Sequence, residues 1–438
     1  MDGDGSFRTV SPDIQAKSKM MQEKHSFWSG AVSGERKSSA SVLLLGIVAI
    51  TVDFESPLLG SKAAVGPLAI SMAQQTNLEP MRPHLGFDIQ DASMYPGGPD
   101  QVKENVGLSH HWGAIIVYPN CTSTWTTSLQ TGNTSYDPTG CIGVFYSGAR
   151  FYQISLLYLA PLMIEFAGLV TQMASSQALT AYIASNSGNT TALNLAATVP
   201  QALATPFSHF QEDVRPINQW AAAAPFEAGL IYYIIMLFQI AFWGNAARQK
   251  TGWNMKLNYV SLVLWRIGLP VLWYFWISLM FSLLFKAFLI PTDGVMSSGA
   301  GFVRLWMLNW LAAIATGLPL ESMIALLTAQ FEPFFLIIWI IFNITSSFQP
   351  IESMEKLYRV CRWAPFLNII EGYKIIFYGT REKHMLGLYF GVLIAISAVC
   401  MILMGLFIAV ERMRENKAMY DQLREKEQKK SKEGSSHR

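Results

Sequence analysis

Charged residues are scarce in this sequence. Asp, Glu, Lys and Arg make up 14% of the 438 residues, whereas an average globular domain carries about 25%. Hydrophobic residues make up 51% of the chain. This balance disfavours a soluble protein of this length and favours an integral membrane protein. The formal net charge of +2 indicates no class of partner, and we expect no nucleic-acid partner.

Motifs for catalysis, phosphate binding and metal binding are absent. The chain contains no G-x-x-x-x-G-K-[ST] loop, because no Lys follows the pair Gly294 and Gly299. It contains no H-E-x-x-H pattern and no nucleophile motif. Its four cysteines match no zinc spacing. We therefore expect no enzyme activity, no cofactor and no metal, and transport could not use an ATPase of this chain's own.

Lys and Arg are rare in residues 53–225, which contain only five of them. The same segment holds two of the four cysteines and three N-glycosylation sequons. Together these features favour an oxidising, lumenal or extracellular setting. The candidates are a disulfide between Cys121 and Cys141 and glycosylation at Asn120, Asn133 and Asn189.

Five apolar runs dominate the rest of the chain. A helix needs about 20 apolar residues to cross a bilayer core of about 30 Å. Four of the runs meet or approach this length. The run Phe334–Phe348 is shorter and would need its flanking residues or a locally thin membrane to span. The runs are Phe226–Trp243, Ile267–Ile290, Phe302–Leu327, Phe334–Phe348 and Leu386–Val410.

Basic residues set the expected orientation. The tail Glu411–Arg438 has nine Lys or Arg against six acids, and the connector Gly244–Asn258 has three basic residues and no acid. The positive-inside bias places both in the cytoplasm. Counting back through five spans puts residues 53–225 outside. Residues 1–39 are polar and without periodicity, and we expect a disordered cytoplasmic tail.

Three segments are ambiguous. Ala40–Val52 is apolar but only 13 residues long, so it is expected to be a short or truncated first span. Ile154–Val170 is either a buried or interfacial helix of the external domain or an extra span. Residues 348–385 are amphipathic and carry six Lys or Arg. They either lie against the outer leaflet and re-enter it shallowly, or form a folded cap on the spans.

Several stretches resemble a known family when taken in order. They cover about residues 50–410 and are Val52-Asp-Phe-Glu-Ser56 with Val65-Gly-Pro67, Trp112-Gly-Ala-Ile-Ile-Val-Tyr-Pro-Asn120, Gly301-Phe-Val-Arg-Leu-Trp-Met307 with Gly317-Leu-Pro-Leu-Glu321, and Leu357-Tyr-Arg359 with Pro365 and Asn368. This pattern is similar to the fungal nitrosoguanidine-resistance protein family, with a DUF3533-type membrane domain related to ABC-2-type permeases. The family has a full span before the Val-Asp-Phe motif, where this chain has only Ala40–Ile50.

Ionisable residues within apolar runs are functional candidates, because burying them in lipid is costly. Glu321 lies toward the inner end of its run, after Gly317 and Pro319, and Arg266 lies at about the same depth in the preceding run. Either the two residues pair or Glu321 lines a polar path for substrate or protons. The alternative is a carboxylate that reaches interfacial water. Asn309 is a further candidate on the path and otherwise bonds neighbouring helices.

The expected fold is an all-α polytopic block with a mixed α+β external domain. The resemblance implies a plasma-membrane or endomembrane protein that confers resistance to toxic small molecules by export or lipid translocation. The alternative is a membrane protein that regulates lipid asymmetry or another transporter. Expected partners are membrane lipids, a small-molecule toxicant and, by analogy with paired permease halves, a second copy of the chain.

Overall fold

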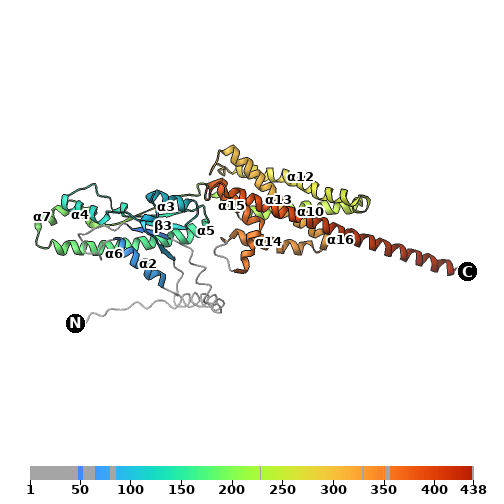
Figure 1. Cartoon of the computed structure of the whole chain (residues 1–438), viewed down its shortest axis with the longest axis horizontal. Helices are drawn as coiled ribbons and strands as arrows, with labels where there is room; N and C mark the ends of the chain where they lie inside the picture. The colour runs from blue at the N-terminus through green and yellow to red at the C-terminus, as the bar shows by residue number, and fades with distance from the viewer. Residues whose placement is uncertain are drawn as a thin grey trace, which may run out of the picture.

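The computed structural model describes residues 48–52, 65–78, 85–226, 228–327, 330–348, 350 and 356–436. Two parts lie side by side along the longest axis (Figure 1). The sheet domain comprises the elements between residues 48 and 226, and the helical block comprises those from residue 228 onward. The predicted tail of residues 1–39 lies outside the described residues.

A five-stranded mixed sheet forms the centre of the sheet domain. Its strand order is β2-β1-β3-β4-β5. β1 runs parallel to β2 and β3, β3 runs antiparallel to β4, and β4 runs parallel to β5. The β-branched run Ile115, Ile116 and Val117 favours a strand and lies in β3. The strands are β1 (Val48–Val52), β2 (Phe87–Ile89), β3 (Gly113–Val117), β4 (Ile142–Tyr146) and β5 (His209–Asp213).

β1 corrects the interpretation of Ala40–Val52 as a short first span. Residues 48–52 are hydrogen-bonded between two strands, which leaves them no part in a membrane helix. The physical reason is their composition: four of these five residues are β-branched, and such residues favour strands. Residues 40–47 lie outside the described residues.

Helices cover both faces of the sheet. Side chains alternate along β3, so Ile115 and Val117 contact the layer formed by α2 (Val65–Leu78) and α6 (Ala160–Ser185). Ala114 and Ile116 instead pack with buried residues of α3 (Gly98–Gly107). The near-continuous apolar sequence of β3 therefore follows from burial on both faces. Smaller helices complete the domain: α4 (Cys121–Thr131), α7 (Thr190–Ala196) and α8 (Pro200–Ala204).

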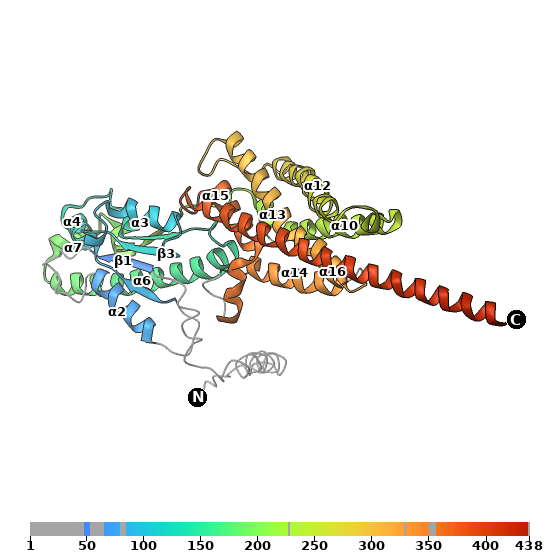
Figure 2. The same ribbon diagram turned by 45° about the vertical axis from the view of Figure 1, so that its right-hand side comes forward.

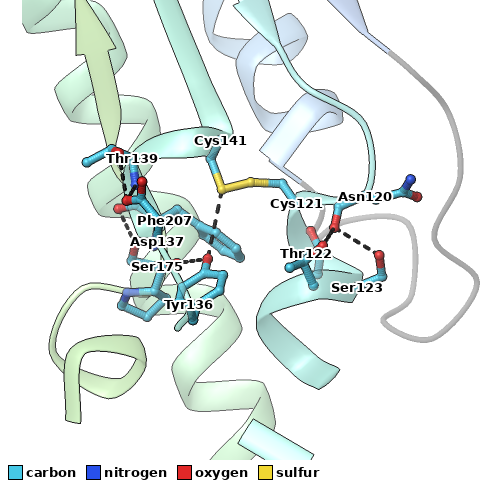
Figure 3. The surroundings of a disulfide bond; sticks show 12 residues. Asn120, Cys121, Thr122, Ser123, Tyr136, Asp137, Thr139, Cys141, Ser175 and Phe207 are labelled. Carbon is cyan, nitrogen blue, oxygen red and sulfur yellow. Dashed lines mark hydrogen bonds between the residues drawn. A yellow bond between two sulfur atoms is a disulfide. The ribbon is translucent and has the colours of Figure 1, made fainter. Parts of the chain in front are cut away.

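A disulfide joins Cys121, the first residue of α4, to Cys141, the residue before β4 (Figure 3). The two Cα atoms are 5.3 Å apart, within the range that a disulfide spans. Beside it, the Tyr136 hydroxyl donates a hydrogen bond to the Pro206 carbonyl at 2.5 Å. The disulfide fastens the start of α4 to the start of β4.

The segment Ile154–Val170 is helical and packs on the sheet. It forms α5 (Tyr152–Ile154), a short π-helical turn (Ser155–Leu159) and the first half of α6. By length and composition alone, Tyr152–Ser185 could cross a membrane. Met163, Phe166 and Val170, however, are buried in the core that α6 shares with the sheet. This packing favours the interpretation as a helix of the sheet domain.

The helical block contains the predicted runs as helices. Four of them are α10 (Ala228–Thr251), α12 (Tyr259–Ala287), α13 (Ser298–Leu327) and α16 (Met385–Ser436), each long and apolar enough to cross a membrane. The short run is α14 (Glu332–Phe348), with 17 residues. With Tyr152–Ser185, which packs on the sheet, five helices of the described residues are long and apolar enough to cross a membrane. The helices of the block and the mixed sheet before them confirm the predicted fold class. α16 extends past the block as a charged helix (Figure 1).

α13 is the central helix of the block. It contacts α10, α12, α14, α15 and α16, and 67% of its most apolar window is buried, against 22–33% for α10, α12 and α16. The outer helices expose apolar side chains instead, among them Trp273 and Ile341. Polar groups inside and apolar groups outside are the arrangement expected of a bundle surrounded by lipid.

The connector between α14 and α16 agrees with the second of its two predicted arrangements, a folded cap on the spans, rather than with a segment that lies on the leaflet. Its helix α15 (Pro365–Tyr378) is buried along its whole length, and it packs on α13, α14 and α16. It lies at the end of the block that faces the sheet domain (Figures 1 and 2). Gly372 permits this packing, because a Cβ there would lie 2.5 Å from Leu308 Cδ2 on α13. The basic residues predicted to meet a leaflet are partly used inside the protein, as Lys374 shows.

Removing the disulfide tests its contribution to the sheet domain. We expect Cys121→Ser to lower the free energy of unfolding by about 3 kcal/mol, the value for a closed loop of this order of length. Thermal unfolding of the detergent-solubilised chain measures the effect, with Cys400→Ser on α16 as the control. Equal unfolding midpoints for Cys121→Ser and the unaltered chain would contradict the prediction.

Candidate functional site

Two arginines and two glutamates form a cluster at the end of the helical block away from the sheet domain. Glu321 of α13 is fully buried, and its Oε1 lies 2.5 Å from Arg248 Nη2 on α10 and 3.5 Å from Arg266 Nε on α12. Arg266 Nη1 also pairs with Glu411 of α16. We call Arg248, Arg266, Glu321 and Glu411 the distal cluster. It connects four helices through two charges of each sign.

Local packing brings α12 and α13 close together beside this cluster. Gly317 lies four residues before Glu321, and a Cβ at Gly317 would lie 2.5 Å from the Tyr274 hydroxyl of α12. Tyr274 is itself fully buried. α13 stays helical through Pro319, so the proline does not interrupt it. The absence of a side chain at Gly317 therefore lets α12 approach closely enough for Arg266 to reach Glu321.

Glu332 is a buried acid that sequence reasoning missed. It is the first residue of α14 and is fully buried. Within the described part of the chain, neither of its carboxylate oxygens has a hydrogen-bond partner. The helix N-terminus favours a negative charge there. The negative charge of Glu321 instead repels one on Glu332. The signal that could have identified Glu332 in the sequence is a single acid at the first position of an otherwise apolar helix.

Asn309 forms a second polar centre farther along α13. Its side-chain nitrogen donates to Ser282 Oγ of α12 at 2.8 Å. Its side-chain oxygen accepts from the Tyr373 hydroxyl of α15, and its carbonyl accepts from the Tyr233 hydroxyl of α10 at 2.9 Å. The 12 residues between Asn309 and Glu321 correspond to about 18 Å of helix. The central helix thus carries two buried polar centres at different depths.

A third polar cluster lies where the sheet domain meets the helical block. Glu371 of α15 accepts from Lys374 Nζ at 2.9 Å and pairs with Arg381 Nε at 2.8 Å. Arg150, from the sheet domain, stacks 3.8 Å from the centre of the Trp112 ring. We call Arg150, Glu371, Lys374 and Arg381 the junction cluster. These side chains line a small cavity together with Ser109 and Thr380.

The junction cluster joins the two parts both electrostatically and through hydrogen bonds. Burial opposes ionisation of Glu371, but Lys374, Arg381 and Arg150 outweigh it and hold the pKa of this carboxyl at about 2. Nearby, Ser109 Oγ of the sheet domain donates to the Thr380 carbonyl of the block at 2.8 Å. A rearrangement of one part would have to break these buried contacts or carry the other part with it.

The structure brings some of the predicted site residues together and keeps others apart. Glu321 and Arg266 form the predicted ion pair, and the structure adds Arg248, which the sequence analysis assigned only to a basic connector. Asn309 makes the predicted bonds to neighbouring helices. Asn120, Asn133 and Asn189 are all exposed on the sheet domain, so each is accessible to modification.

In the part of the chain that the structure describes, no group of three or more His, Cys, Asp or Glu side chains is placed to hold a metal ion. The distal cluster also offers no ligand set, because its two carboxylates are already paired with arginines. Buried, paired charges can stabilise a bundle or line a polar route through it.

Residues 38–402 match the family described as "Protein of unknown function (DUF3533)". A relative from Saccharomyces cerevisiae, described as an uncharacterized endoplasmic reticulum membrane protein, is 25% identical over 327 residues. The alignment covers 68% of this chain and 59% of the relative, so the chain spans about three fifths of that protein. No solved structure matches the chain.

The distal cluster predicts an abundance defect that a second substitution repairs. Glu321→Gln leaves two buried arginines short of a carboxylate, which costs about 3–5 kcal/mol for a buried pair, so less folded protein should accumulate. Arg248→Gln combined with Glu321→Gln removes one charge of each sign and leaves Arg266 paired with Glu411. Quantitative gel filtration of the membrane extract should show this double variant near the normal amount.

Glu165→Gln, at an exposed acid of α6, is the matched control and should leave the amount unchanged. If Glu321→Gln alone accumulates normally, the ion pairs do not hold the helices together.

The junction cluster predicts a pH-dependent contribution to stability. The folded pKa of Glu371, about 2, lies below its ordinary value of 4.5. Its stabilisation is therefore complete above about pH 4.5 and is lost as the pH falls toward 2. The difference in unfolding midpoint between the unaltered chain and Glu371→Gln should be large at pH 7 and shrink below pH 4.5. A difference that is independent of pH would contradict the assignment.

Proposed function

The chain belongs to the DUF3533 family, and from that premise we propose that it moves amphipathic toxic molecules or lipids across its membrane. The observation that carries the proposal is the placement of buried polar centres along the central helix. Asn309 and Glu321 supply polar groups at two depths within a bundle whose outer surface is apolar. A molecule that crosses such a bundle meets groups able to hold its polar end. The proposal involves no catalysis by this chain.

The substrate class follows from the resemblance to the fungal nitrosoguanidine-resistance proteins. We propose nitrosoguanidine-like toxicants as substrates and an ABC-2-type, permease-like block as the route. The chain has no ATPase motif, so a permease of this kind would take its energy from elsewhere. A second copy of the chain, by analogy with paired permease halves, is part of the proposal.

The sheet domain is proposed to face the lumen or the cell exterior, with the C-terminus in the cytoplasm. Supporting features are the exposed sequons, the disulfide and the basic residues at the far end of the block, such as Arg248 and Lys250. The description of the yeast relative supports the endoplasmic reticulum over the plasma membrane that the sequence analysis favours. Either membrane gives the sheet domain the same topological side.

Regulation without transport is the second candidate function. It is favoured by α16, whose charged extension runs past the block and exposes its side chains through much of residues 417–426. Such a helix offers a surface for another membrane protein, while the junction cluster would transmit changes in the sheet domain. A regulator of lipid asymmetry or of another transporter would need that extension more than it needs Glu321.

Growth in the presence of nitrosoguanidine tests the proposal. Cells lacking the chain should regain resistance with the unaltered chain and with Glu165→Gln. The Arg248→Gln/Glu321→Gln double variant should fail to restore resistance although its amount is near normal, because the neutralised centre no longer serves the polar route. Full resistance with the double variant would show that Glu321 has only a packing role.

Truncation after Asn416 distinguishes the second candidate function. This variant keeps Glu411 and its pairing with Arg266 but loses the charged extension. Resistance should persist if the block moves the toxicant itself. Loss of resistance with normal abundance would favour regulation through a partner that binds the extension.

The proposed orientation makes a separate prediction for glycosylation. Because Asn120, Asn133 and Asn189 are exposed on one domain, all three should be accessible to modification in the same compartment. Replacing each Asn by Gln should remove one step of gel mobility that glycosidase digestion also removes. If glycosidase leaves the gel mobility of the unaltered chain and of all three variants unchanged, the proposed orientation of the sheet domain is contradicted.

A further inference from the structure

A groove between α13 and α16 is not used by the function proposed above. It lies near the beginning of both helices, at the end of the block that faces the sheet domain, and has a volume of about 730 Å³, within the range of small-molecule sites. Its wall combines cationic and apolar side chains. They are Arg304, Lys383 and His384 on one hand and Val303, Met307, Leu386 and Phe390 on the other.

The cationic part of the groove has little acid around it. Within the described residues, no carboxylate lies within ion-pair distance of Arg304 or Lys383. Arg304 Nη1 instead contacts the thioether sulfur of Met296 at 2.6 Å. His384 Nδ1 lies 2.9 Å from Glu382 Oε2. Two full positive charges therefore face the groove without a counterion from the protein.

The apolar residues of the groove lie at helical spacing on both helices. Val303 and Met307 are successive positions on one side of α13, and Leu386 and Phe390 are equivalent positions on α16, four residues apart in each case. Val303 is about half exposed, at 52%. In a lipid-surrounded block, this side of the groove meets acyl chains. The groove thus combines cationic and apolar side chains near the starts of both helices.

From this arrangement we infer that the groove binds a phospholipid with an anionic headgroup in the leaflet on the side of the sheet domain. Basic pockets between membrane helices attract anionic headgroups, and the Arg guanidinium and Lys ammonium can both bind a phosphate or carboxylate. The four apolar side chains would contact the upper part of the acyl chains. The inference does not depend on transport, because a bound structural lipid and a transported one would occupy the same groove.

Titration with fluorescent phosphatidylserine tests the inference. The purified full-length chain in a neutral detergent is titrated with an acyl-labelled phosphatidylserine and, separately, with the equivalent phosphatidylcholine. Phosphatidylserine should bind at least tenfold more tightly. Arg304→Gln combined with Lys383→Gln should remove this preference. The control is Lys286→Gln, which removes a charge in the last turn of α12 but outside the groove and should leave the preference intact.

Two further measurements identify what the groove recognises. Val303→Trp fills the apolar side and should weaken phosphatidylserine binding at least tenfold while both cations remain. Inorganic phosphate should compete only weakly, since it lacks acyl chains. The inference is overturned if both lipids bind equally, if the double variant keeps the preference, or if phosphate competes as well as the lipid does. Only variants whose gel-filtration profile matches that of the unaltered chain are compared. The result of these binding measurements is independent of the result of the resistance tests.

Discussion

A charge buried within a lipid-surrounded bundle is costly without a partner of opposite sign, and this cost governs the packing around Glu321. Glu321 lies between Arg248 and Arg266, and Arg266 also pairs with Glu411. These pairs fix the relative positions of α10, α12, α13 and α16 along their axes, because sliding one helix by a turn would separate charges that cost several kcal/mol to leave alone. Apolar packing alone would allow many such positions, since lipid is as apolar as the helices.

The same principle explains why the connector helix α15 is buried rather than spread over the membrane surface. Lys374 and Glu371 can enter the protein because they neutralise each other, with Arg381 and Arg150 completing the cluster. Burying α15 places Tyr373 against Asn309, so the junction cluster and the polar centre of α13 belong to one continuous set of contacts. The sheet domain, the connector and the central helix are therefore mechanically linked.

Hydropathy located the membrane helices because apolar length is a strong and local signal. β3 and the helical nature of residues 152–185 were also predictable from local pattern. The sequence failed at Ala40–Val52 because a short apolar run is compatible with both a buried strand and a helix, and sheet pairing decides between them. At residues 348–385 the sequence left a surface segment and a folded cap both open, because Arg150, which helps to neutralise Glu371, lies far away in the chain.

The candidate site was predictable in part for related reasons. A lone acid in an apolar run marked Glu321, and similar depth suggested Arg266 as its partner. Arg248 was assigned to the basic connector because it lies near a helix end, where a cation usually reaches water; only the packing of α10 on α13 turns it inward. Glu332 escaped notice because it begins its helix, a position where an exposed acid is common.

Retention of a fluorescent toxicant in living cells tests the central claim most directly. Cells lacking the chain are loaded with the toxicant, and its loss is followed with and without re-expression of the unaltered chain. The account predicts faster loss and lower retention on re-expression. Restored resistance with unchanged retention would contradict transport and favour regulation of another membrane protein.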